Sequence, residues 1–168
     1  RWLDKHPPAT TATVRESAWS CAHGVGRWRT DCGCSTGGRP GSTQAWRAPL
    51  RAALDLLRDH AAEVFERRGK GVLQDHWAAR DAYVDLVIGA QTADAFAAIH
   101  LGSGAPAEAQ RTFLDVMEAQ RWRLSMFASC AWFWESPERI ETASALRAAT
   151  RAARIMDALA GTDLERRL

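Results

Sequence analysis

From residue 44 onward, hydrophobic positions recur at three- and four-residue intervals, which is typical of amphipathic helices. In the segment 44–68 these positions are Trp46, Leu50, Ala53, Leu54, Leu57, Ala61, Val64 and Phe65. Gly69 and Gly71 follow, and glycine commonly ends a helix because it tolerates the left-handed conformation there. The pattern predicts a first helix over 44–68.

Two shorter helices are predicted next. One starts after Asp75 and stops at Gly89, and the other follows Thr92 and runs through Ile99. Asp and Thr are residues that commonly precede a first helical turn. Glycines at 102–104 then open a turn.

The longest predicted helix covers 106–135, because no Gly or Pro interrupts this run. At 3.6 residues per turn it has about eight turns. Pro137 ends it, and a further hydrophobic stripe runs over 140–159 until Gly161. We therefore predict an all-α fold, a bundle of about five helices with a long Gly/Cys-rich N-terminal loop packed on it.

The first 43 residues have no sustained hydrophobic period and hold six of the twelve glycines, which predicts a loop. The chain begins with Arg1 rather than Met and has no signal peptide, so we interpret 1–15 as a linker or the remnant of a longer protein. With 168 residues in all, 16–168 are expected to form a single helical domain.

The charge balance names no partner. Twenty-two Lys and Arg oppose twenty Asp and Glu, a net charge of +2, which argues against nucleic acid or acidic lipid as a partner. No apolar run approaches the ~20 residues that a membrane span needs. Without a membrane span or an export signal, we expect a cytoplasmic protein.

The residues that could carry chemistry are concentrated in the N-terminal loop. Cys21, His23, Cys32 and Cys34 fall within fourteen positions, and Cys130 lies on the longest predicted helix. Zinc prefers four tetrahedral thiolate or imidazole ligands. We predict that Cys21, Cys32, Cys34 and Cys130 bind zinc, with an iron–sulfur cluster as the alternative cofactor. Whether His23 replaces one thiolate is left open.

Two other interpretations of the cysteines remain. In the first, the cysteines are reduced, partly buried thiols, as free cysteines commonly are, and His23 is a hydrogen-bonded core residue. In the second, the cysteines pair as disulfides. Neighbouring acidic residues are interpreted as solvated surface groups, and no catalytic residue is assigned. Arg27 and Trp28 form a basic and aromatic patch that could stack on a ligand. Among consecutive aromatic residues at 132–134, at least one should reach a partner or ligand, because helical neighbours point about 100° apart.

The segment ESAWSCAHGVGRWRTDCGCSTGG, at 16–38, resembles a motif in the helical region that follows the catalytic barrel in proteins related to glycoside hydrolase family 57. A second segment, MFASCAWFWESPERIETASALR at 126–147, resembles a later part of that family. The intervening QAWRAPLRAALDLLRD and DHWAARDAYVDL are similar to it as well. The chain departs from the pattern at Ala131, where Gly is expected, and over 135–139.

The resemblance implies a carbohydrate-active parent protein of the α-glucan type, whose paired catalytic carboxylates lie on a preceding barrel. A retaining pair must be held about 5–5.5 Å apart on one scaffold, so this chain alone should not hydrolyse sugars. The resemblance also implies that the helical region lines the glucan cleft. The side chains it would offer are Trp19, His23, Arg27, Trp28 and Trp132.

Three functions follow. The first is an accessory, metal-stabilised domain of a family 57-like carbohydrate-active protein, with the preceding barrel and an α-glucan as partners. The second is a metal- or iron–sulfur-binding module with a redox or interaction role unrelated to carbohydrate. The third is a structural domain without a ligand.

Overall fold

The computed structural model describes residues 10, 12–13, 21–34, 36, 38, 40–69 and 75–168. Within these ranges the regular structure is entirely helical, which confirms the all-α prediction. In chain order the elements are η1 (Gly26–Trp28), α2 (Arg47–Gly69), α3 (His76–Val87), α4 (Ala93–Leu101), α5 (Ala107–Ser125), η2 (Ser129–Trp132), α6 (Ile140–Ala160) and α7 (Leu164–Arg167).

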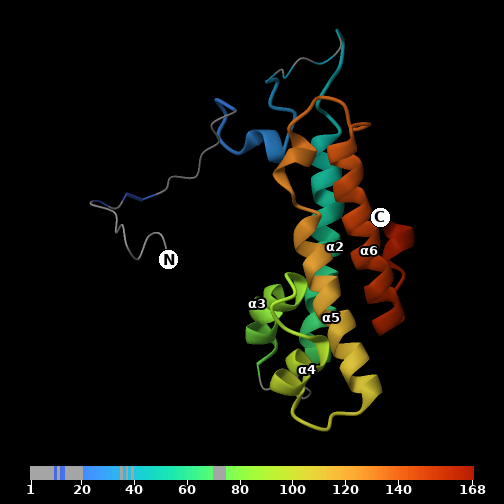
Figure 1. Ribbon diagram of the computed structural model, residues 1–168. Coiled ribbons are helices and arrows are strands. Elements are labelled where there is room, and N and C mark those ends of the chain that lie inside the picture. Colours follow the sequence, from blue (N-terminus) through green and yellow to red (C-terminus); the bar gives the residue numbers. More distant parts are fainter. Residues whose placement is uncertain are drawn as a thin grey trace.

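Three long helices, α2, α5 and α6, lie side by side and run alternately down, up and down the molecule (Figure 1). Their facing sides carry the apolar stripes, and Leu54, Met117 and Met156 are fully buried. α6 contributes mainly alanines to this core, which lets its backbone approach α5 closely. The bundle is thus held by the burial of periodic apolar positions.

The two short helices α3 and α4 pack at one end of the bundle (Figure 1). Their beginnings match the predictions, because Asp75 accepts hydrogen bonds from Trp77 N and Ala78 N, and Thr92 caps α4. Such caps satisfy amide groups that have no partner within the helix. A small cluster around Phe96, which stacks on Phe113, fixes this end.

The predicted helix over 106–135 is wrong in its length. α5 ends at Ser125, and the chain continues through η2 into an irregular segment before α6. Neither Gly nor Pro breaks the helix. Instead, the chain turns after α5, and Met126 and Trp132 are packed in the bundle core, both at 0% exposure. Tertiary burial therefore overrides local helical preference here.

The segment 129–135 is held in place by hydrogen bonds from side chains of the N-terminal half. Its carbonyl oxygens accept hydrogen bonds from four side chains, at 2.7–3.1 Å: Arg27 to Phe133, Trp28 to Ser129, Arg47 to Trp134, and Trp46 to Glu135. In an α-helix most of these carbonyls would bond within the helix, so the side chains stabilise the irregular path.

This segment and η1 lie together at the end of the bundle where α2 begins, α5 ends and α6 begins (Figure 1). The candidate site is built at this end. Among the helices that the structure describes, none is long and apolar enough to cross a membrane.

Candidate metal centre

A tight turn brings Cys21 and His23 together. Gly24 N donates to Cys21 O and Gly26 N donates to His23 O, each at 3.2 Å, so the chain folds back directly into η1. Further along the loop, Gly33 separates Cys32 from Cys34. Gly24 and Gly33 both have positive φ, 64° and 72°, a conformation that residues with a Cβ rarely adopt.

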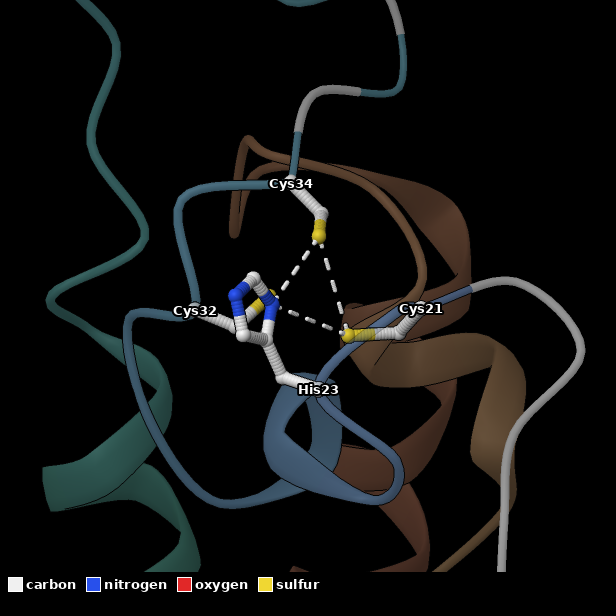
Figure 2. A group of neighbouring side chains, drawn as sticks. All are labelled: Cys21, His23, Cys32 and Cys34. Carbon is white, nitrogen blue, oxygen red and sulfur yellow. Dashed lines mark hydrogen bonds between the residues drawn. The ribbon is translucent and has the colours of Figure 1, made fainter.

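The four side chains converge on one point (Figure 2). Cys21 Sγ lies 3.7 Å from Cys34 Sγ and 3.8 Å from His23 Nδ1. Cys34 Sγ lies 3.4 Å from the same nitrogen. One ligand atom from each of Cys21, His23, Cys32 and Cys34 lies within 4.8 Å of all the others.

These separations fit a single tetrahedral ion. With Zn–S bonds of about 2.3 Å and a Zn–N bond of about 2.05 Å, tetrahedral angles place two sulfurs about 3.8 Å apart and a sulfur and a nitrogen about 3.5 Å apart. The corresponding distances here are 3.7 Å for the sulfur pair of Cys21 and Cys34, and 3.4 and 3.8 Å for sulfur to His23 Nδ1. The three distances among Cys21, His23 and Cys34 therefore match a tetrahedral ion, and Cys32 lies within 4.8 Å of each of these ligand atoms.

Proton affinity differs among the clustered thiols. Burial would raise the pKa of Cys21, but hydrogen bonds from His23, Cys34 and Cys32 outweigh it and lower the pKa to about 6. The hydrogen bond with Cys21 raises the pKa of Cys34, and burial adds to this. The lowered pKa favours the thiolate form of Cys21, the form that binds a metal.

Cys32 is anchored by Gln44, which precedes α2, and by Arg47, the first residue of α2. Gln44 Nε2 donates to Cys34 O at 2.5 Å, and Gln44 Oε1 lies 3.5 Å from Cys32 Sγ. Arg47, which is 0% exposed, donates to Gln44 Oε1 at 2.7 Å and approaches Cys32 Sγ at 3.7 Å. The loop is therefore joined to the start of α2 through the cysteines themselves.

The buried Arg47 guanidinium needs a negative charge nearby. Its hydrogen-bond acceptors, apart from Cys32, are the neutral oxygens of Gln44, Phe133 and Trp134. Burial lowers the pKa of Arg47, and the charge of Cys32 opposes that shift. A buried cation is costly unless an anion compensates it, and a metal-bound Cys32 thiolate would provide that compensation.

The structure corrects the predicted fourth ligand. Cys130 is exposed on η2 and is not a member of the group, whereas His23 is. In η2 the neighbouring Ala131 and Trp132 are turned inward, which leaves Cys130 facing outward. The sequence did hold the signal, because C-x-H in 21–23 and C-x-C in 32–34 are two short ligand pairs.

The predicted glucan-contacting residues that the structure describes do not form one exposed surface. Trp19 lies outside the described residues, and His23 belongs to the metal group. Arg27 is 1% exposed and donates to Phe133 O, and Trp132 is 0% exposed, so a polysaccharide cannot reach either in this conformation. Trp28 is half-buried and bonds to Ser129 O. The buried positions of Arg27 and Trp132 are those of residues that stabilise the fold.

A pocket next to the metal loop contains aromatic residues that sequence reasoning did not single out. It has a volume of about 600 Å³ and is lined by Trp46, Trp134 and Glu135, together with hydroxyl side chains such as Thr36 and others at 42–43. Trp134 is the member of the aromatic triplet that faces this pocket. Glu135 is 5% exposed and accepts a hydrogen bond from Thr36 N.

Comparison with known proteins identifies the helical part. The family model described as a domain of unknown function, DUF3536, matches residues 43–168. No curated protein and no solved structure matches the chain. None of these findings links the chain to glycoside hydrolase family 57, so that resemblance stays a prediction. The four clustered side chains precede the matched range, whereas Gln44 and Arg47 lie within it. Since the match covers more than half of the chain, the protein belongs to the DUF3536 family of domains.

Proposed function

We propose that Cys21, His23, Cys32 and Cys34 bind one zinc ion that holds the N-terminal loop on the helical bundle. The single observation that carries this proposal is the set of ligand distances, all within 4.8 Å and three of them at 3.4–3.8 Å. The four protein ligands fill all positions of a tetrahedral shell, whereas a catalytic zinc keeps one position open for water or substrate. The role is therefore structural.

An iron–sulfur cluster is less well supported. In a cluster the protein ligands are divided among two or more iron atoms, so ligands on different irons lie further apart than the ligands of one ion. Here one ligand atom from each of the four residues lies within 4.8 Å of all the others, and the described group has three thiols rather than four. Free thiols at this density also fit a reducing compartment, which supports a cytoplasmic location.

The test begins with elemental analysis of protein purified without added metal. We expect one zinc per chain, lost in Cys32→Ser and retained in Cys130→Ser, the matched control outside the group. Cobalt substitution should give the absorption of a tetrahedral site with thiolate ligands. Metal-free protein that binds neither zinc nor cobalt, or equal loss of metal in the control, would disprove the zinc site.

We further propose that the domain is an accessory part of a family 57-like carbohydrate-active protein and contributes one wall of an α-glucan cleft. The pocket with Trp46 and Trp134 supports this, because indole rings give flat apolar surfaces, and the surrounding hydroxyls and the Glu135 carboxylate offer hydrogen bonds. Arg139 lies over the Trp134 ring at 4.4 Å and covers part of one face.

Titration with an α-1,4-linked glucan oligosaccharide tests this second proposal. We expect weak binding that is lost in Trp134→Ala and kept in Trp77→Ala, since Trp77 is 37% exposed on α3, away from the pocket. The chain alone should not hydrolyse the oligosaccharide. Binding that is absent, or unchanged in Trp134→Ala, would remove this proposal and leave the zinc site standing.

A further inference from the structure

Within the metal group, two of the sulfurs are already close to a distance at which they could bond to each other. Cys21 Sγ and Cys34 Sγ are 3.7 Å apart, and a disulfide requires about 2.05 Å. Both residues lie outside the helices, in loop segments that contain the positive-φ glycines Gly24 and Gly33. The approach therefore requires movement of loop backbone and no change in the bundle.

The geometry selects this pair over a bond between Cys32 and Cys34. Cys32 Sγ is held on the side of α2 by Gln44 Oε1, 3.5 Å away, and by Arg47, 3.7 Å away. A bond within the 32–34 turn would also enclose only Gly33 in a small, strained ring. Figure 2 shows the Cys34 sulfur directed toward Cys21 and the His23 ring.

We propose that Cys21 and Cys34 form a reversible disulfide on two-electron oxidation, and that its formation expels the metal. The expulsion of the metal rests on the proposed zinc site, whereas the formation of the disulfide does not. With a hydroperoxide as oxidant, the sulfur of Cys34 attacks one peroxide oxygen, the O–O bond breaks, and the Cys34 sulfenic acid and water (or an alcohol) are formed. The sulfur of Cys21 then attacks the Cys34 sulfur, the S–S bond forms, the S–O bond breaks, and water leaves.

The accessible members of the group make this reaction feasible. Cys34 is partly exposed and His23 is exposed, so a small oxidant can reach the site, whereas Cys21 is 6% exposed and resolves the intermediate from within. Oxidation removes two of four ligands. The remaining Cys32 and His23 cannot complete a tetrahedral shell, so the same side chains hold either a metal or a disulfide.

The test uses the full chain in a Cys130→Ser background, which removes the exposed thiol outside the group. Hydrogen peroxide is added, metal release is followed with a chromogenic chelator, and peptide mapping locates the disulfide. We expect one metal released per disulfide formed, a bond between Cys21 and Cys34, and recovery of metal binding after a thiol reductant and zinc are added.

A second variant separates this inference from the zinc proposal. Cys32→Ser should lose the metal, because it lacks one metal ligand. It should still form the bond between Cys21 and Cys34, because both of these cysteines are unchanged. If the purified protein holds no metal, the zinc proposal fails and the mapping still tests the disulfide. Oxidation that leaves Cys21 as a free thiol, or that joins Cys32 to Cys34, would overturn the inference.

Discussion

Replacing Arg47 with Met tests the link between the metal loop and the bundle. Arg47 is 0% exposed, and its guanidinium donates to Gln44 Oε1 at 2.7 Å, Trp134 O at 3.0 Å and Phe133 O at 3.4 Å, besides approaching Cys32 Sγ. Methionine keeps much of the length and apolar character of the arginine side chain but donates no hydrogen bond. The change therefore removes the charge and the hydrogen bonds with little loss of packing.

The expected magnitude comes from these contacts. Removing one member of a buried charged pair costs about 3–5 kcal/mol, because its partner is left buried without compensation. Trp134 O and Gln44 Oε1 would lose a charged donor, and Phe133 O would keep Arg27 and Thr36 as donors. We expect Arg47→Met to lower the free energy of unfolding of the zinc-loaded protein by about 3–5 kcal/mol.

The loss should be smaller in metal-free protein. There no metal ion fixes Cys32 beside Arg47, so the substitution removes a weaker interaction. Urea denaturation of both proteins, with and without zinc, measures the two differences. The control is Arg58→Met on the same helix, whose ion pairs with Asp55 and Asp59 are partly exposed and should contribute about 1 kcal/mol or less. Equal losses for Arg47→Met in the two states would refute the charge coupling.

Three further outcomes are expected. Cys32→Ser should increase protease cleavage within 21–34 while far-ultraviolet circular dichroism stays near wild type, because the helices keep their own apolar core; an equally protected loop would contradict the anchoring role. Asp157 accepts hydrogen bonds from the first amides of α7 and from Thr162, and these outweigh burial and lower its pKa. Its contribution is present above the unfolded pKa of about 3.9 and is lost as pH falls through the lower folded value. Asp157→Asn should therefore cost about 1 kcal/mol at pH 7 and progressively less as the pH falls below about 3.9 in denaturation experiments. Gly38→Ala would place a Cβ 2.6 Å from the Glu135 carboxyl carbon, so we expect a loss of about 1–3 kcal/mol by thermal or chemical unfolding, and an unchanged stability would show that Glu135 can move freely.

The sequence by itself determined the helical elements that depend on local signals. The stripe over 140–159 and Gly161 give α6, which runs from Ile140 to Ala160 with Gly161 in the left-handed conformation. Asp75 and Thr92 cap α3 and α4 as predicted. These features involve residues within four positions of each other, so periodicity and capping chemistry are sufficient to find them. The division into 1–15 and 16–168 stays a prediction.

The sequence also supplied the ligand residues of the candidate site, and it misplaced one of them. Three of the four predicted ligands, Cys21, Cys32 and Cys34, are close together, because short turns with glycine determine their positions locally. Cys130 was expected to join them because the glycine-rich loop needs an anchor on the longest predicted helix, but the chain leaves that helix at Ser125 and η2 turns Cys130 outward.

Only the tertiary structure decided the end of α5, the burial of Trp132 and the exposure of Trp134 to a pocket. The deciding contacts join residues far apart in the chain: Arg27, Arg47 and Trp46 donate to carbonyls of the segment 129–135 across 86 to 106 positions. A hydrogen bond over such a separation leaves no periodic trace in the sequence. It forms because folding buries those carbonyls, and a buried carbonyl outside a helix needs a donor from elsewhere in the chain.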